Sequence, residues 1–204
     1  KLKNRAIGVR RRIVDLAHKA GKNGAHLGGS LSIVEILTAL YASLQKIVDE
    51  DRDRVILSKG HAALAHYALL EALGFLTKED TDSFEINGTH LYAHEPRNIE
   101  RGSEFSGGSL SLGLSFAVGV AMACRNKGYS NHIYAIVGDG ECNEGLVWES
   151  AMAIANYNLN NMTVIVDCNA VQLDGTTKDI MNTESLAEKF CSFGFYVIEV
   201  DGHD

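Results

Sequence analysis

The sequence lacks the features that would place the protein in a membrane or outside the cell. No apolar run approaches the ~18 residues that a membrane-spanning helix needs, and no apolar stretch follows the amino-terminal Lys-Leu-Lys-Asn-Arg to suggest a signal peptide. Cysteine is scarce, and the four thiols have neither metal-ligand nor redox spacing: Cys124, Cys142, Cys168 and Cys191. In a chain long enough to fold around its own core, we expect reduced thiols and a cytoplasmic protein.

An excess of basic residues is also missing. The 19 Lys and Arg are outnumbered by 26 Asp and Glu, which gives a net charge of −7, so the chain has no electrostatic reason to bind nucleic acid. The one basic cluster, Arg10–Arg12, is expected to be the solvated face of a helix. The length of 204 residues favours a single domain, 1–204. Because Asp204 has the character of a helix N-cap without its helix, we expect that a C-terminal segment is lacking.

The alternation of strand and helix patterns predicts the fold class. β-branched runs predict strands, and apolar residues at helical spacing predict helices between them. Such runs are typical of parallel strands that are buried on both faces, so the sequence predicts an α/β fold with a doubly wound, mostly parallel sheet and helices on both faces. The expected strands are 55–57, 132–137, 162–167 and 195–200, and the expected helices are 4–20, 32–45, 62–74, a short one after 77, 109–127, 144–157 and 185–193.

Three local patterns carry further expectations. A glycine-rich loop is predicted over Gly21–Ser30, and Ser32 with Glu35 has the spacing of a capping box that opens the next helix. The segment from Ile86 to Ser109 has little periodicity and contains the only proline. A loop of that length in a compact domain is usually functional.

The ends of two neighbouring strands carry the most informative side chains. Gly138-Asp139-Gly140 ends one strand, and Asp167-Cys-Asn169 ends the next one along the chain. Ligands bind at the carboxyl ends of parallel strands, and we expect the glycines to allow unusual backbone angles and a close approach by a ligand. A carboxylate and an amide suit Mg²⁺ or Ca²⁺, but Mg²⁺ would need more oxygens from a phosphorylated ligand and water. A dinucleotide or the tail of thiamine diphosphate could supply them.

Competing phosphate motifs are weak here. Asn143 stands where a dinucleotide fingerprint would need a glycine after Gly138 and Gly140. Gly140 and Gly145 have the separation of a P-loop, but Leu146 and Val147 replace its Lys and Ser/Thr.

The residue order of these motifs resembles that of a known family. Gly138-Asp-Gly-Glu-Cys-Asn-Glu-Gly-Leu-Val-Trp-Glu149 and Asp167-Cys-Asn-Ala-Val-Gln-Leu-Asp-Gly175 resemble the thiamine-diphosphate motif, with wording similar to the amino-terminal subunits of split transketolases. The resemblance implies a thiamine-diphosphate-binding fold whose cofactors are thiamine diphosphate and Mg²⁺, which Ca²⁺ or Mn²⁺ could replace. It implies these metal ligands: Asp139 and Asn169 by side chain and Val171 by its carbonyl. It adds Gly138 and Gly140 as cofactor-binding residues.

The resemblance extends to four other segments. Ala25-His26-Leu27-Gly-Gly-Ser-Leu-Ser32, Ser58-Lys-Gly-His-Ala62, Tyr92-Ala-His94 and Gly107-Gly-Ser-Leu-Ser-Leu-Gly113 are similar to transketolase segments. It implies catalytic roles for His26, His61 and His94, with His61 also near the diphosphate, and cofactor contacts for Gly108 and Leu110. Glu144 would lie at a subunit interface near the cofactor, or else be a solvated helix N-terminal carboxylate. The other five histidines are expected to be structural: His18, His66, His90, His132 and His203.

The chain also departs from the family pattern. Leu27 and Glu95 stand in place of prolines, and Ala25 and Ala93 in place of glycines. Ser111-Leu112 replaces Gly-Gln. These changes could alter loop geometry and the preferred substrate.

The resemblance implies transfer of a two-carbon ketol unit from a ketose phosphate to an aldose, as in pentose phosphate metabolism. The pyrimidine-binding domain, with its activating glutamate, would lie on a separate C-terminal transketolase subunit, giving a dimer of heterodimers. Two alternatives stay open: another thiamine-diphosphate enzyme, either a deoxyxylulose-phosphate synthase or a component that decarboxylates 2-oxoacids, and a non-catalytic cofactor-binding subunit.

Overall fold

The computed structural model describes residues 1–44 and 49–203. The expected helix end near Gln45 and the expected helix cap at Asp204 lie outside these residues. The chain forms two compact units. The first contains Lys1–Leu44, Gly60–Gly108 and the residues from Gly202 on, and the second contains the segment that ends at Lys59 together with Ser109–Asp201. These are units of packing, and the single domain expected from the sequence stays a prediction.

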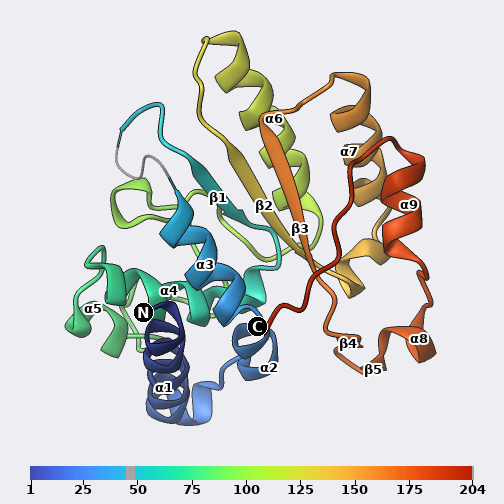
Figure 1. Cartoon of the computed structure of the whole chain (residues 1–204). Coiled ribbons are helices and arrows are strands. Elements are labelled where there is room, and N and C mark those ends of the chain that lie inside the picture. The colour runs from blue at the N-terminus through green and yellow to red at the C-terminus, as the bar shows by residue number, and fades with distance from the viewer. Residues whose placement is uncertain (45–48, 204) are drawn as a thin grey trace. The chain divides into compact units, whose positions relative to one another are not determined.

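The first unit is a group of helices around α4. Its helices are α1 (Leu2–Ala20), α2 (Leu27–Ser32), α3 (Val34–Ser43), α4 (Ala63–Leu73) and α5 (Lys78–Asp82), with short 3₁₀ turns η1 (Gly21–Asn23), η2 (Gly60–Ala62) and η3 (Ile99–Arg101). Helix α1 packs on α3 and α4 (Figure 1) through Val9, Ile13 and Leu16, which recur at helical spacing. Every residue from Ala63 to Leu70 is buried, so α4 is the core helix of this unit.

Two of the expected local signals in this unit are wrong. Ile33, not Ser32, occupies the N-cap of α3, and no side chain caps that helix. Glu35 instead accepts hydrogen bonds from Arg10 of α1, one of them at 2.9 Å, because a charge-assisted fork with arginine is stronger than a local cap. The predicted glycine loop is shorter than expected, since residues from Leu27 onward form α2.

The helix end expected near Gly74 and the helix start expected after Thr77 are confirmed. Gly74 adopts the left-handed conformation that ends α4. Thr77 and Asp80 form a reciprocal capping box that opens α5. Residues 86–109 contain only the short turn η3 and one bridge, between Asn98 and Ser103, which agrees with the predicted irregular segment.

The second unit is built on a parallel sheet. Among the described residues its strands are β1 (Arg54–Leu57), β2 (Ile133–Gly138) and β3 (Met162–Asp167), in the order β1-β2-β3 (Figure 1). The central strand β2 is apolar and almost wholly buried, as expected for a strand with neighbours on both sides. The β2–β3 register places Gly138 opposite Asp167, so both strands end at the same level.

Helices and a small hairpin complete this unit. They are α6 (Leu112–Asn126), η4 (Gly140–Asn143), α7 (Gly145–Asn156), β4 (Val171–Gln172), β5 (Gly175–Thr176), α8 (Thr177–Ile180) and α9 (Leu186–Ser192). Helix α6 packs against β2 and α7. A Cβ atom on Gly113 of α6 would come within 2.5 Å of the Ser58 Cα. Small residues therefore let this helix lie close to its neighbours.

One expected strand is wrong. Residues 195–200, all described, form no strand, and Tyr196, Ile198 and Val200 are 91%, 68% and 80% exposed. A β-branched run becomes a strand only where another strand pairs with its backbone. The β4–β5 hairpin and α8 were not predicted. All four cysteines are free thiols, as expected, and none of the helices in the described part of the chain is long and apolar enough to cross a membrane.

Candidate functional site

The ends of β2 and β3 bring two sequence-predicted residues together in the second unit. Asp139 directly follows β2, and its two carboxylate oxygens accept hydrogen bonds from Gly140 N at 2.8 Å and Ala170 N at 2.7 Å. The second of these bonds ties Asp139 to the residue that follows Asn169. Each carboxylate oxygen keeps further lone pairs after accepting one bond, so Asp139 is fixed in place and still able to bind a cation.

Asn169 has a defined orientation in the same turn. Its amide nitrogen donates to Asp167 Oδ2 at 3.0 Å, and its amide oxygen accepts from Val171 N at 3.0 Å. Ala170 between them adopts φ 60°, a left-handed conformation that is uncommon for a residue with a side chain. Strain of this kind occurs at functional sites, where the surrounding contacts hold it.

Buried charges that the sequence did not single out surround this turn. Lys59 is fully buried and donates to Asp167 Oδ2. Glu141 is 2% exposed and accepts from the Ser58 hydroxyl, from Ser111 N at 2.7 Å and from Gly138 N at 3.0 Å. The one signal that could have found them is the Ser58-Lys59 pair of the predicted Ser-Lys-Gly-His segment.

The sum of these charges suits a divalent cation. Among the described residues at this turn, Asp139, Glu141 and Asp167 are buried acids and Lys59 is a buried base. Burial raises the pKa values of Asp139 and Glu141, although their hydrogen bonds act in the opposite direction. A bound Mg²⁺ would compensate this excess of negative charge, and oxygen donors are the ligands that it prefers.

The expected metal ligands are of mixed type. Among the described residues, no cluster of three or more His, Cys, Asp or Glu side chains could hold a metal ion. The set expected here has one carboxylate, one amide and the carbonyl of Val171. It leaves coordination positions for a phosphorylated ligand.

Glycine has a steric role at this turn. Gly138 and Gly140 do not adopt positive φ, so the expectation of unusual backbone angles is wrong. A Cβ atom on Gly140 would lie 3.0 Å from the Cβ and Oε1 atoms of Gln172, so a larger residue would require the Gln172 side chain to shift. Close approach is therefore the reason for glycine at position 140.

The remaining cofactor candidates lie on turns. Gly108 has φ 144° and is exposed. Leu110 immediately precedes Ser111, whose amide is held by Glu141 and whose φ is 72°. Glu144 is exposed at the N-cap position of α7 and makes no side-chain capping bond. Its interface role stays a prediction.

The three predicted histidines gather in the first unit. The ring of His26 lies 5.4 Å from that of His94 and 6.1 Å from that of His61, measured between centroids. They come from three different places: the N-cap of α2, the long irregular segment, and η2 before α4. Segments 68 residues apart in the sequence, from 26 to 94, thus supply one cluster of imidazoles.

Two details describe the surroundings of these imidazoles. Desolvation and, to a smaller extent, the neighbouring His26 lower the pKa of His94, while Glu85 opposes them. His94 is therefore neutral at pH 7 and able to accept a proton. A Cβ atom on Gly29 would come within 2.5 Å of the His61 ring, so glycine at this position leaves the space that the ring occupies.

Comparisons with known proteins agree with this geometry. The family model for the transketolase, thiamine diphosphate binding domain, matches residues 3–204. The chain is 38% identical over 200 residues to an apulose-4-phosphate transketolase subunit of Phocaeicola vulgatus, covering 96% of this chain and 70% of that protein. It is 40% identical over 208 residues to 6-deoxy-6-sulfo-D-fructose transketolase subunit SqwG of Clostridium sp. (strain MSTE9), covering 94% and 76%.

Solved structures show the same fold. Transketolase from Leishmania mexicana superposes with a TM-score of 0.90 at 28% identity, covering 98% of this chain and 32% of that one. Transketolase from Campylobacter jejuni gives 0.89 at 28% identity, covering 100% and 33%. The chain thus spans about one third of each solved transketolase chain. The likeness confirms the predicted α/β class.

A parallel sheet whose strand ends carry a buried acid cluster defines an α/β cofactor-binding domain. With the family model matching nearly the whole chain, the protein belongs to the transketolase family, as a thiamine diphosphate-binding domain. Its relatives are transferase subunits of the transketolase type.

Proposed function

We propose that this chain is the subunit of a two-chain transketolase that binds the diphosphate of thiamine diphosphate through Mg²⁺. Asp139 and Asn169 would ligate the metal by side chain and Val171 by its carbonyl, while Gly138 and Gly140 line the turn. The observation that carries this proposal is the buried excess of carboxylates at the adjoining ends of β2 and β3. Ca²⁺ or Mn²⁺ would fill the same oxygen site less selectively.

The histidine cluster would manage protons on the substrate. When bound, thiamine diphosphate supplies the nucleophilic carbon that carries a two-carbon ketol unit from a ketose phosphate to an aldose. His26 and His94 would then hold or move protons at the hydroxyl and carbonyl oxygens of the sugar. His61 would serve nearer the diphosphate. An imidazole side chain can donate or accept a proton near neutral pH, which suits this task.

The active enzyme would need a partner chain. Two relatives are named as subunits of transketolases, and the family resemblance implies that a partner carries the glutamate that activates the aminopyrimidine. A C-terminal transketolase subunit would supply it, in a dimer of heterodimers located in the cytoplasm. The relatives act on apulose 4-phosphate and 6-deoxy-6-sulfo-D-fructose, so the donor here would be a phosphorylated or similarly acidic ketose, in pentose phosphate or related sugar metabolism.

The metal assignment is tested with three single variants in the presence of the partner subunit. Asp139→Ala and Asn169→Ala should each weaken Mg²⁺-dependent thiamine diphosphate binding at least tenfold in calorimetry. The control is Asp174→Ala, an exposed acid in the β4–β5 loop, which should bind as the unchanged chain does. Unchanged binding in Asp139→Ala would refute the assignment.

Turnover then distinguishes the alternatives. A transketolase converts a ketose phosphate only when an aldose acceptor is present, whereas a deoxyxylulose-phosphate synthase or a 2-oxoacid decarboxylase consumes pyruvate. Cofactor binding without either activity in the reconstituted complex would indicate a non-catalytic subunit.

A further inference from the structure

A buried chain of polar side chains lies in the first unit, outside the site described above. Tyr41 of α3, His66 of α4 and Glu95 of the irregular segment are 7%, 1% and 3% exposed. The Tyr41 hydroxyl lies 2.5 Å from His66 Nε2, and His66 Nδ1 lies 2.9 Å from each oxygen of the Glu95 carboxylate. Glutamate is almost never fully buried unless it is paired, so Glu95 depends on His66.

The directions of these hydrogen bonds follow from the chemistry of the groups. Burial, reinforced by the charges of Glu95 and Glu104, raises the pKa of Tyr41 well above its ordinary value. Its hydroxyl therefore stays protonated and can donate to His66 Nε2. The proton on Nδ1 is then available to Glu95, so each member of the chain orients the next.

Glu95 is the immediate neighbour of His94. On the other side of His94, the Tyr67 hydroxyl donates to the carbonyl oxygen of Tyr92 at 3.1 Å. His66 and Tyr67 are consecutive residues of α4, the buried core helix. The backbone that carries His94 is thus fastened to one turn of one rigid helix at both ends.

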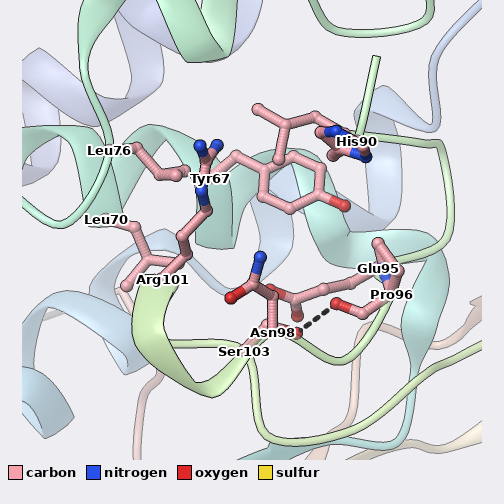
Figure 2. Close-up of a pocket in the computed structure, with 10 residues that line it drawn as sticks. Tyr67, Leu70, Leu76, His90, Glu95, Pro96, Asn98, Arg101 and Ser103 are labelled. Carbon is pink, nitrogen blue, oxygen red and sulfur yellow. Dashed lines mark hydrogen bonds between the residues drawn. The ribbon is translucent and has the colours of Figure 1, made fainter. Parts of the chain in front are cut away.

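The same segment is tied to the glycine turn that carries Gly108. Gly107 N donates to the carbonyl oxygen of Glu95 at 2.8 Å. Figure 2 shows Glu95 and Pro96 beside Tyr67 in the lining of a small cavity of about 10 Å³, where the Ser103 hydroxyl donates to the carbonyl oxygen of Pro96 at 2.7 Å. The carboxylate of Glu95 is thus buried and bound by His66, while the adjacent His94 is exposed.

We propose that Tyr41, His66 and Glu95 are positioning residues that hold the His94 backbone in the orientation in which its imidazole faces His26. Glu95 stands where the family pattern has a proline, so a buried hydrogen-bonded anchor replaces the stiffness of a proline ring. The effect on catalysis rests on the proposed role of His94 toward the sugar, but the effect on the position of His94 does not. A loop held in advance avoids the entropic cost of ordering it in the transition state.

Four variants in the complex with the partner subunit test this proposal. Glu95→Ala removes the anchor, and Tyr41→Phe removes only its outermost hydrogen bond. Glu95→Gln keeps the shape and one acceptor for His66 Nδ1. Glu100→Ala, an exposed acid in the same segment, is the matched control. The readouts are the NMR titration of His94 in histidine-labelled protein, assigned with His94→Gln, the urea midpoint, and kcat and KM for the ketose donor.

With the anchor removed, the His94 titration should move toward the ordinary histidine value, since the ring leaves its desolvated place beside His26. The ratio kcat/KM should fall about 10- to 100-fold in Glu95→Ala, less in Tyr41→Phe, and Glu95→Gln should recover most of the loss. Glu100→Ala should match the unchanged chain in every readout.

Two results would overturn the proposal. One is an unchanged His94 titration in Glu95→Ala and Tyr41→Phe. The other is a loss of kcat/KM in Tyr41→Phe that follows only the urea midpoint while the His94 titration of that variant is normal. A moved titration with normal turnover would support the positioning role and refute the role of His94 in catalysis.

Discussion

Cys142 and Cys191 carry the same thiol in different surroundings. Cys142 is fully buried below the Gly138–Gly140 turn, and burial, followed by the charge of Glu141, raises its pKa to about 12. Cys168 is exposed, but desolvation and then Asp139 and Asp167 raise its pKa as well. Cys191 is exposed on α9, and Cys124 is buried in α6. The sequence shows four equivalent residues, and the structure makes them chemically unequal.

The four thiols should therefore react at different rates. A raised pKa lowers the thiolate fraction at a given pH, and the thiolate is the reacting form. At pH 8, a disulfide reagent should modify Cys191 first and Cys168 more slowly, while Cys124 and Cys142 stay unmodified until the chain unfolds. Stopped-flow absorbance measures the phases, and Cys191→Ser should abolish the fast phase alone. Rapid modification of Cys142 in folded protein would contradict its burial.

At the scale of elements, α2 shows how two adjacent glycines differ. A Cβ atom on Gly28 would meet nothing within 4 Å, whereas one on Gly29 would overlap the His61 ring. Both residues lie in the same helix and neither has a positive φ. Only contact with η2 separates their roles.

Alanine substitutions should separate the two glycines. Gly28→Ala should stabilise the chain by up to ~1 kcal/mol, because alanine favours the helix. Gly29→Ala should destabilise it by about 1–3 kcal/mol through overpacking and should move the NMR signals of the His61 ring. Urea unfolding of the pair measures both effects. Equal midpoints for the two variants would show that the His61 ring moves aside without cost.

Local sequence patterns predicted some elements correctly and failed at others, depending on the partners that the fold supplies. The helix expected after Thr77 formed, and Asp80 caps it through one carboxylate oxygen while Arg101 binds the other. The Ser32–Glu35 signal failed, because Arg10 of α1 takes the Glu35 carboxylate. The strand expected at residues 195–200 failed for a related reason: an apolar alternating run specifies a strand only when a neighbour pairs with it.

At the scale of the whole molecule, the buried charge of the β2–β3 turn couples stability to ligands. Three buried carboxylates with one buried lysine cost folding free energy unless a cation joins them. Anything that binds the folded chain alone raises its stability by mass action. In the proposed site, oxygens of the diphosphate complete the coordination of the metal. Each should therefore improve the binding of the other.

Mg²⁺ and thiamine diphosphate together should therefore stabilise the complex more than the sum of their separate effects. At 100 times the dissociation constant, the gain is about 2.7 kcal/mol. Thermal unfolding with each ligand alone and with both measures the coupling, and Mg²⁺ with inorganic pyrophosphate isolates the share of the diphosphate. Strictly additive shifts would argue against a shared site.

The sequence by itself determined the helices with clear periodicity, the buried parallel strands, and the placement of Asp139 and Asn169 at neighbouring strand ends. These features depend on repeats and spacings of a few residues, which the chain carries locally. Only the tertiary structure decided that Lys59 pairs with Asp167 across 108 residues, that His26, His61 and His94 meet, and that His66 holds Glu95. Packing brings such pairs together from distant parts of the sequence. Because burial removes water, each polar or charged group must then bind a partner that the fold places beside it.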